Sequence, residues 1–476
     1  MSNHDILHAF INGQWVRPTG TEMMPICNPA NEEVIGQLHL GRSEDVDVAV
    51  QAASKAFLDF GQTSKAERLD LLRRLRVETE KRMEDMAQAM RLEMGAPIDF
   101  ARAHQADAAL GHLDGFITAL RAQDARQTLE NGDVLLHEPI GVVGLITPWN
   151  WPINQIALKV LPALATGCTM VLKPSEHTPL SAQIYAEIIE AAGYPAGVFN
   201  MIHGTGLGVG EAISSHPDIQ MVSFTGSTRA GVSIATQAAP TIKKVTLELG
   251  GKSPNLLFAD ADLDKAIPQA LEECFLNTGQ SCDAPTRLLV ERAIYDEVCA
   301  RAAEGANQTK LGDPASEGNH LGPLFDKIQF DRVQDAIQAG LDEGARLVAG
   351  GLGRPEGYEK GWYVKPTVFV DVHNEMHIAQ HEIFGPVLVI IPFDSEDEAI
   401  TIANDTPYGL AGFVQTSDRD RAERVAAKLR VGAVHINGGV YQYGSPFGGY
   451  KASGNGREGG IWGLEDFQEI KTLHYG

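Results

Sequence analysis

The chain has 476 residues, of which 62 are acidic and 39 are basic, and its formal net charge is −23. A surface of this charge repels phosphate backbones and acidic lipids, which argues against nucleic acid and membrane surfaces as partners. The length exceeds that of one compact core, so we expect about two or three domains.

The five cysteines form no Cys-x-x-Cys pair and are odd in number. This pattern favours a reducing compartment over a disulfide framework, and it contains no zinc-site spacing. The N-terminus has no basic region followed by an apolar stretch, and the apolar segment 141–171 carries prolines and Lys159. We therefore expect a cytoplasmic protein with no signal peptide, no membrane span and no metal.

The N-terminal part is predicted to be mainly helical. A strand-like piece at 10–16 comes first, and apolar residues at helical spacing then predict helices over 45–60, 66–94 and 97–124.

From residue 141 onward, short apolar runs alternate with helical windows. The predicted strands are 142–146, 170–173, 198–202, 221–224 and 245–247. The predicted helices between them are 152–166, 180–192, 206–215 and 228–237. This alternation indicates βαβ units in a parallel, doubly wound sheet, which binds ligands at the carboxyl ends of its strands.

A second alternating series runs from about residue 254 to 450. Its clearest predicted strands are 287–290, 368–371 and 387–391. Two extended pieces, 133–138 and 467–474, belong to neither series, and such leftover strands often pair with another subunit.

The most informative feature is Cys282, which follows Gly279-Gln280-Ser281 and lies downstream of Glu248. A thiolate attacks carbonyl carbon, and a nearby carboxylate can take a proton from water. The pair suggests a covalent acyl-enzyme that is then hydrolysed, although an isolated cysteine usually only packs. Asn150, between Trp149 and Trp151, is a candidate oxyanion donor, and a turn or helix-capping role is the alternative.

Two further motifs suggest a dinucleotide. Gly226 and Ser227 lie at a strand-to-helix junction, where free backbone N–H groups favour a pyrophosphate, although a simple tight turn fits equally well. Lys173 and Glu176 follow a strand and match a pair that holds sugar hydroxyls. A carboxylate there repels a 2′-phosphate and favours NAD over NADP, but either residue alone could be a solvated loop charge.

In their order along the chain, seven motifs resemble the NAD(P)-dependent aldehyde dehydrogenase superfamily, over about residues 10 to 470. They are PWNWP (148–152), KPSE (173–176), FTGS (224–227), ELGGK (248–252), GQSC (279–282), EIFGP (382–386) and PFGGYK (446–451).

The resemblance implies that Cys282 is the nucleophile and that Glu248 activates the deacylating water. The side chain of Asn150 and the backbone N–H of Cys282 would form the oxyanion hole. Lys173 and Glu176 would hold the adenosine ribose. The carboxylate at position 248 points to the hydrolytic type rather than the CoA-acylating type, and we expect Cys282 to have a lowered pKa in an electropositive setting.

The resemblance also implies NAD as the cofactor, with NADP possible. Beyond Lys173 and Glu176, the implied cofactor contacts are Ile146, Thr147, Trp149, Gly206, Phe224, Gly226, Ser227, Glu382 and Phe384.

The expected fold class is α/β, with a doubly wound Rossmann-like cofactor domain, an α/β catalytic domain and a small β oligomerisation extension. Residues 1–118 and 140–250 are assigned to the NAD-binding domain and 251–450 to the catalytic domain. The segments 119–139 and 451–476 are assigned to oligomerisation, and a homodimer or homotetramer is expected.

The expected substrate is a small-molecule aldehyde. The predicted pocket is rich in aromatic and polar side chains: Trp151, Asn154, Gln155, Leu158, Ser281, Asp283, Tyr441, Gln442, Tyr443 and Phe447. This composition favours an aromatic or medium-length polar aldehyde. A broad-specificity enzyme, whose polar lining bonds only to itself, and a semialdehyde-specific dehydrogenase are alternatives.

Two other classes of protein compete with this interpretation. A non-catalytic NAD-binding or structural protein on the same fold would be free to lose Cys282, Glu248 or Asn150, and all three are present. A thiol hydrolase would pair Cys282 with a histidine and would leave the nucleotide motifs unexplained.

Overall fold

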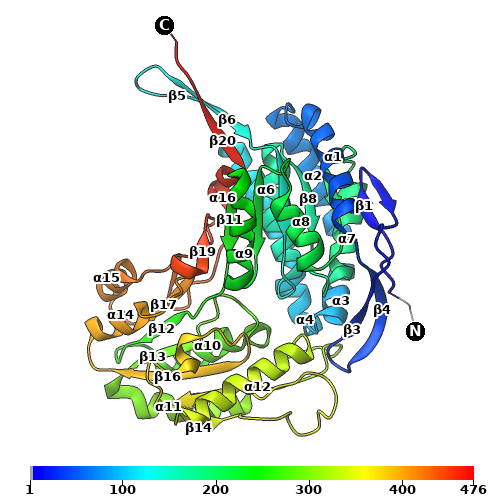
Figure 1. The fold of residues 1–476 in the computed structure, drawn as a ribbon. Helices are drawn as coiled ribbons and strands as arrows, with labels where there is room; N and C mark the ends of the chain where they lie inside the picture. The colour runs from blue at the N-terminus through cyan, green and yellow to red at the C-terminus, as the bar shows by residue number, and fades with distance from the viewer. Residues whose placement is uncertain (1–3, 476) are drawn as a thin grey trace.

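Two mainly parallel sheets, each covered by helices on both faces, organise residues 4–475, the part of the chain that this computed structural model describes (Figure 1). The predicted α/β class is confirmed. No helix within these residues is both long and apolar enough to cross a bilayer.

The first sheet has eight strands in the order β19-β11-β10-β7-β8-β9-β1-β2, and β7 to β11 run parallel to one another. In that order the strands are Gly454–Asn455, Lys244–Glu248, Met221–Thr225, Val142–Ile146, Thr169–Lys173, Phe199–Met201, Ala9–Ile11 and Gln14–Val16. Each predicted strand of the series 142–247 is present, to within about one residue at either end.

Alternate residues of β7 face opposite layers, which makes this sheet doubly wound. Val143 and Leu145 pack into a core with α2, α3, α5, α6 and α7, whereas Val142 and Ile146 pack with α1, α8 and α9. The helices of the two layers are α1 Ser43–Phe60, α2 Lys65–Lys81, α3 Met83–Glu93, α4 Ile98–Phe100, α5 Asp107–Ala122, α6 Pro152–Thr166, α7 Pro179–Ala191, α8 Glu211–Ser215 and α9 Thr228–Ala238.

Four predicted elements differ from the structure. The single strand at 10–16 is the hairpin β1–β2, because Asn12 and Gly13 both have positive φ and form its turn. The helix at 66–94 divides at Arg82, whose ψ is 10°. The helix at 97–124 contains a π-helical turn at Ala101–Ala106 between α4 and α5, and that at 206–215 begins with one at Gly206–Gly210.

The second sheet has seven strands in the order β14-β15-β16-β13-β12-β17-β18, all parallel except β14. In that order they are Arg346–Ala349, Thr367–Val370, Val387–Phe393, Arg287–Glu291, Pro254–Leu257, Ala411–Gln415 and Ala433–Ile436. Its helices are α10 Leu263–Phe275, α11 Tyr295–Gln308, α12 Lys327–Asp342, α13 His377–Gln380, α14 Glu396–Asn404 and α15 Arg419–Lys428.

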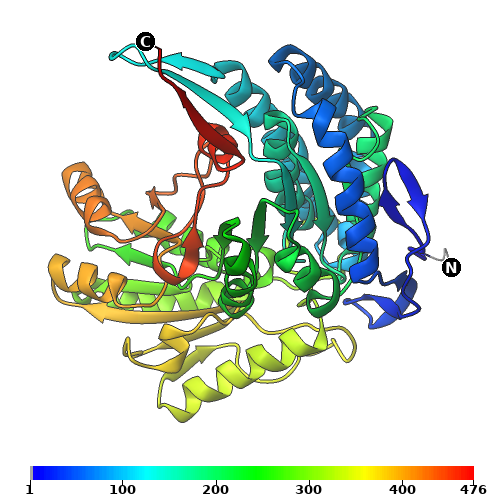
Figure 2. The ribbon, with the colours of Figure 1, turned by 45° about the horizontal axis from the view of Figure 1, so that its top comes forward.

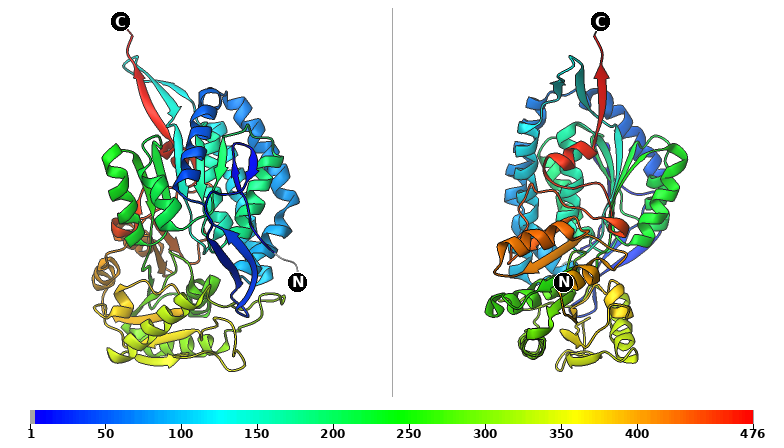
Figure 3. Two further views of the ribbon diagram at one scale, coloured as in Figure 1. Left: turned by 45° about the vertical axis from the view of Figure 1, so that its right-hand side comes forward. Right: turned by 90° about the vertical axis from the view of Figure 1, so that its left-hand side faces the viewer.

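Each of the two large sheets, together with its covering helices, forms one body. A three-stranded arm projects from one end of the first body, beside the C-terminus (Figure 3). It consists of β5 Arg126–Thr128, β6 Val134–Pro139 and β20 Gln468–Leu473, so the two leftover strands predicted from the sequence pair with each other. The C-terminal chain returns from the second body to the first before it enters the arm (Figure 2), through β19, which pairs with β11, and α16 Gly460–Asp466. A separate hairpin joins β3 Met23–Asn28 to β4 Glu33–His39.

Candidate active site

The sequence-predicted side chains from the first sheet gather at one edge, because β8, β7, β10 and β11 are parallel neighbours. Lys173 ends β8, Thr147 and Asn150 follow β7, Thr225 ends β10 and Glu248 ends β11. The carboxyl ends of parallel strands form the crevice in which ligands bind.

The nucleophile candidate lies on a strained loop after α10. Asn277, Thr278 and Gly279 have φ values of 54°, 56° and 72°, all in the left-handed region. A Cβ at position 279 would lie 2.2 Å from the carbonyl carbon of Gly385, so only glycine fits. The side chain of Gln280 donates to the Asn277 carbonyl (3.0 Å) and accepts from the Phe325 N–H (2.9 Å), which holds the loop two residues before Cys282.

Asn150 and Glu248 lie beside this loop. The buried Asn150 donates its Nδ2–H to the Gln280 carbonyl at 3.0 Å. Glu248 acts electrostatically on Cys282 from the end of β11. The structure therefore brings together the three side chains that the sequence predicts for covalent chemistry at a carbonyl.

The expectation of an electropositive setting for Cys282 is wrong for the protein without ligands. Burial raises the pKa of the Cys282 thiol well above its usual range, and the carboxylates of Asp283, Glu382 and Glu248 raise it further. The ordinary pKa of a thiol already lies above neutral, so the Cys282 thiol is protonated at neutral pH.

Glu248 is held away from water and away from hydrogen-bond donors. Neither of its carboxylate oxygens has a partner among residues 4–475. Burial and the nearby Glu458 raise the pKa of Glu248 well above its usual range, and the Lys159 ammonium opposes them. A Cβ at Gly448 would lie 2.6 Å from Oε1 of Glu248, so this wall of the site requires glycine.

Sequence reasoning missed the ion pair behind Glu248. Lys159 on α6 is wholly buried and donates to Oε1 of Glu458 at 2.5 Å. A lysine inside the otherwise apolar helix 152–166 was a visible signal, because a buried charge needs a partner. The partner itself is 299 residues away in the chain, beyond any pattern of spacing.

Lys173 and Glu176 form the expected pair. Nζ of Lys173 donates to Oε2 of Glu176 at 2.8 Å, and the lysine is buried. Burial alone would raise the pKa of Glu176, but the Lys173 ammonium outweighs it and lowers that pKa, so the carboxylate is charged.

The proposed pyrophosphate region offers unpaired donors. Hydroxyl oxygens of Thr147 and Thr225 are buried at the ends of β7 and β10 with no partner among the described residues. Ser227 caps α9 by accepting from Ala230 N–H, and a Cβ at Gly206 would meet open space. Unsatisfied buried groups next to a helix N-terminus fit a bound dinucleotide.

Gly226 needs its missing side chain, because a Cβ there would lie 2.4 Å from the buried ring of Phe224. Ile146, at the end of β7, is buried in the same core as Phe224. Both predicted contacts therefore support the floor of this region through their packing.

The segment predicted for the nicotinamide, which contains Glu382 and Phe384, lies against the loop after β11. Oε1 of Glu382 accepts from the Gly251 N–H at 3.2 Å, and burial raises the pKa of Glu382 to about 7. The ring of Phe384 meets that of Trp149 edge-on at 5.5 Å, while Trp149 stacks on Phe325 at 4.4 Å. Residues 149 and 384 from the two bodies thus share one wall.

Among the predicted pocket residues, Trp151 and Ser281 meet directly, through an indole N–H donated to the serine hydroxyl at 2.9 Å. Gln155 and Leu158 are buried on α6, and Oε1 of Gln155 has no partner among residues 4–475. Asp283 is beside Cys282, and burial raises its pKa.

His112 contacts three of the predicted pocket residues, and the sequence analysis missed it. Its Nε2 lies 2.7 Å from Oδ1 of Asn154, and its ring meets those of Tyr443 (4.9 Å) and Tyr441 (6.4 Å). Burial lowers the pKa of His112 to about 4, so the imidazole is neutral. Tyr441 in turn meets Phe447 edge-on at 6.1 Å, so the predicted aromatic residues form one cluster.

The chain belongs to the aldehyde dehydrogenase family, whose sequence model matches residues 15–473. It is 50% identical, over 98% of both chains, to a 3-succinoylsemialdehyde-pyridine dehydrogenase from a Pseudomonas species. An aldehyde dehydrogenase structure from Bartonella henselae has a TM-score of 0.98 at 49% identity, covering 99% of this chain and 100% of that one. An aldehyde dehydrogenase C variant from Pseudomonas syringae, in complex with NAD+ and octanal, has a TM-score of 0.97 at 48% identity, covering 99% and 97%.

Proposed function

We propose that this protein oxidises an aldehyde to the carboxylic acid with NAD+, through a thioester on Cys282. The observation that carries the proposal is that two predicted side chains act on the loop after α10: Asn150 donates to the Gln280 carbonyl, two residues before Cys282, and Glu248 acts electrostatically on Cys282 itself. This arrangement supplies a nucleophile, an oxyanion donor and a base at one point. A non-catalytic protein would not need all three.

The residues present fit the cofactor. Lys173 and Glu176 would hold the adenosine ribose, and the charged carboxylate of Glu176 disfavours a 2′-phosphate, which makes NAD the preferred cofactor and NADP a poorer one. Gly226 and Ser227 would receive the pyrophosphate, and Glu382 and Phe384 the nicotinamide end. When bound, NAD accepts the hydride that leaves the aldehyde carbon.

The remaining chemistry belongs to the side chains of this chain. The Cys282 thiol releases its proton to solvent, its sulfur attacks the carbonyl carbon, and the new oxyanion accepts hydrogen bonds from Asn150 Nδ2–H and the Cys282 backbone N–H. Loss of hydride leaves a thioester. Glu248 then takes a proton from water, the hydroxide adds to the thioester carbon, and the carbon–sulfur bond breaks to release the acid.

The substrate is proposed to be an aromatic or medium-length polar aldehyde. The rings of Tyr441, Tyr443, Phe447 and His112 support this proposal, because aromatic walls suit a ring. A semialdehyde is the second candidate, and it is favoured by the 50% identity to the 3-succinoylsemialdehyde-pyridine dehydrogenase. Trp151 and Asn154 already have partners, whereas Oε1 of Gln155 has none among the described residues and is free to meet a polar substituent.

The test is NADH formation by the purified protein with benzaldehydes, octanal, pyridine-bearing semialdehydes and succinate semialdehyde, with NAD and with NADP. Activity that is absent from Cys282→Ala supports the proposed chemistry, and the order of kcat/KM values ranks the substrate classes. NAD binding without turnover of any aldehyde would instead favour a non-catalytic protein.

We also propose that the chain forms a homodimer or homotetramer through its arm. The strands β5 and β20 are the edges of a three-stranded sheet, and Ile470 on β20 is 62% exposed. Edges of this kind pair with other chains. The segments 119–139 and 451–476 keep their proposed oligomerisation role, beside domains at 1–118 with 140–250 and at 251–450. Light scattering after size exclusion tests the assembly, and a monomer contradicts it.

A further inference from the structure

The loop that precedes Cys282 contains two residues in a conformation that side chains disfavour. Asn277 and Thr278 have φ values of 54° and 56°, and neither is glycine. Strain of this kind persists only where the surroundings fix the backbone, and it concentrates at functional sites. The groups that fix Asn277 are therefore informative.

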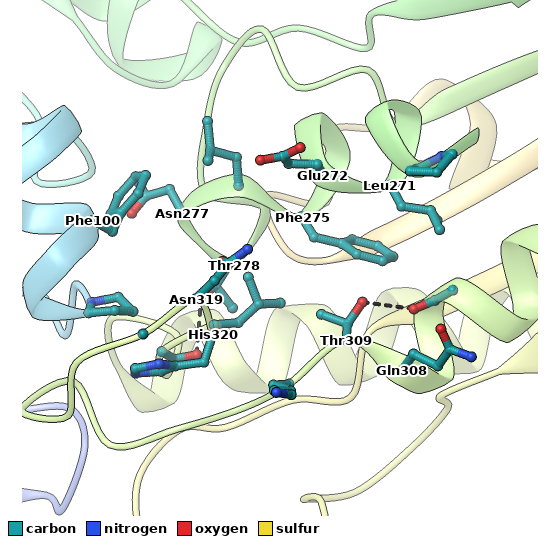
Figure 4. A pocket seen from close by; sticks show the side chains of 18 of the residues that line it. Phe100, Leu271, Glu272, Phe275, Asn277, Thr278, Gln308, Thr309, Asn319 and His320 are labelled. Carbon is teal, nitrogen blue, oxygen red and sulfur yellow. Dashed lines mark hydrogen bonds between the residues drawn. The ribbon is translucent and has the colours of Figure 1, made fainter. Parts of the chain in front are cut away.

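One side of this loop borders open space. Asn277 and Thr278 line a cavity of about 980 Å³ that also borders α4, α10 and the segment 318–322 (Figure 4). Phe100, Phe275 and His320 form other parts of its wall. Because one side of the loop faces this space, the contacts on its other side, hydrogen bonds among them, hold it in position.

Several of these hydrogen bonds meet at Asn150. Nδ2 of Asn277 donates to the backbone carbonyl of Asn150 at 2.9 Å and to that of Gln280 at 3.2 Å. Nε2 of Gln105, from the π-helical turn before α5, donates to the same Asn150 carbonyl at 3.1 Å and to Oδ1 of Asn277 at 3.4 Å. All four residues are buried.

The Gln280 carbonyl also accepts from the side chain of Asn150, at 3.0 Å. This contact fixes which end of the Asn150 amide points toward the nucleophile, because its oxygen would be repelled by the carbonyl. One N–H of Nδ2 is thereby used, and the second remains for a substrate oxygen. Asn277 is hydrogen-bonded both to the backbone of Asn150 and to the carbonyl that orients its side chain.

Gln105 gives independent support for a role of this hydrogen-bond network in holding Asn150. Its Oε1 is buried and has no partner among the described residues, so its amide carries an unsatisfied acceptor. An apolar residue would avoid that penalty. The amide makes structural sense through its donor end, which contacts Asn150 and Asn277.

We propose that Asn277, supported by Gln105, is a positioning residue that sets the Asn150 donor for the developing oxyanion. This inference rests on the proposed aldehyde dehydrogenase function. Asn277 itself does not contact the reacting atoms in this arrangement and acts through Asn150.

The variant that tests it is Asn277→Gly, because glycine adopts the left-handed conformation without strain and only the amide is lost. We expect kcat for aldehyde oxidation to fall by about 10- to 100-fold, as for a displaced donor, while the Kd for NAD is unchanged. Thr278→Gly is the matched control. It makes the same backbone change at the next residue and removes a contact to the Gly322 carbonyl instead, so kcat should stay within about twofold.

A double-mutant cycle separates positioning from general weakening of the fold. In an Asn150→Ala background, Asn277→Gly should lower kcat by no more than about twofold, because the group through which it acts is gone. Equal losses in both backgrounds would overturn the proposal. Gln105→Leu should reproduce the loss in part, and it serves as the second variant if Asn277→Gly melts at a lower temperature.

Failure of the two proposals can be told apart. Wild-type protein that oxidises no aldehyde contradicts the proposed function. Active wild-type protein, together with an Asn277→Gly variant as active as Thr278→Gly, contradicts only the positioning role.

Discussion

Lys159 and Glu458 form a buried ion pair whose members come from α6 and from the chain just before α16, and Glu248 lies within its electrostatic field. The two charges have opposite effects on Glu248. Burial is the largest cause of the raised pKa of Glu248, Glu458 raises it further, and Lys159 lowers it. The ion pair therefore tunes the pKa of Glu248.

This relationship predicts a shift in pH dependence. Glu248 accepts a proton from water only when it is deprotonated, so deacylation should increase as the pH rises through its pKa. Glu458→Gln removes the negative charge that raises this pKa, and the acid limb of the kcat–pH profile should move to lower pH. Lys159→Met removes the opposing charge and should move the limb to higher pH. Profiles between about pH 5 and pH 9 would reveal both shifts, and unchanged limbs would count against this coupling.

Removing the base should separate the two halves of the reaction. In Glu248→Gln the thioester forms but no carboxylate activates water, so NADH should appear as a burst of about one equivalent per active site, followed by a slow rate. Stopped-flow absorbance measures the burst, and mass spectrometry should find the acyl group on Cys282. Cys282→Ala, which cannot form the thioester, should show no burst. Full steady-state turnover by Glu248→Gln would exclude Glu248 as the base.

Loss of the oxyanion donor should reduce kcat sharply. Asn150→Ala is expected to lower kcat by about 10²–10³-fold, or about 3–4 kcal/mol in the transition state, since its Nδ2–H would stabilise charge that develops only there. Asn154→Ala is the matched control four residues on, where the amide contacts His112 instead. That variant should change the KM for bulky aldehydes and leave kcat for a small aldehyde nearly intact. Similar losses in both variants would point to a general disturbance of this segment.

Cofactor choice should follow the charge on Glu176. Glu176→Gln keeps the shape and the hydrogen-bond acceptor but removes the negative charge, and it frees the Lys173 ammonium from its partner at 2.8 Å. The ratio of kcat/KM for NADP to that for NAD should therefore rise, because a free cation attracts the 2′-phosphate. Steady-state kinetics with each cofactor measure the ratio. An unchanged ratio would mean that some other group excludes the phosphate.

The fold was predictable where local signals agree. Strand β7 (Val142–Ile146) and helix α6 (Pro152–Thr166) match their predicted bounds, because a continuous apolar run marks the strand and Pro152 and Gly167 mark the ends of the helix. The hairpin at Asn12-Gly13 had a visible turn signal that the single-strand prediction overlooked. The π-helical turn at Ala101–Ala106 has no comparable signal, and it depends on the packing around it.

The site was predictable in its motifs but not in its supporting contacts. Cys282, Asn150 and Glu248 belong to short motifs that the sequence displays. By contrast, Lys159 with Glu458 and Gln105 with Asn277 are separated by 299 and 172 residues, and only the folded chain brings each pair together. The predicted lowering of the pKa of Cys282 was wrong for the same reason. The shift depends on burial and on carboxylates such as Glu382, which come from other segments of the chain.

The raised pKa of Cys282 also bears on how long the enzyme survives. Peroxide attacks a thiolate far faster than a thiol, and further oxidation to sulfinic acid cannot be repaired by ordinary thiols. Burial and the neighbouring carboxylates keep this sulfur protonated in the protein without ligands. We therefore expect Cys282 to resist peroxide between turnovers and to be open to such damage only while its thiol is ionised for attack.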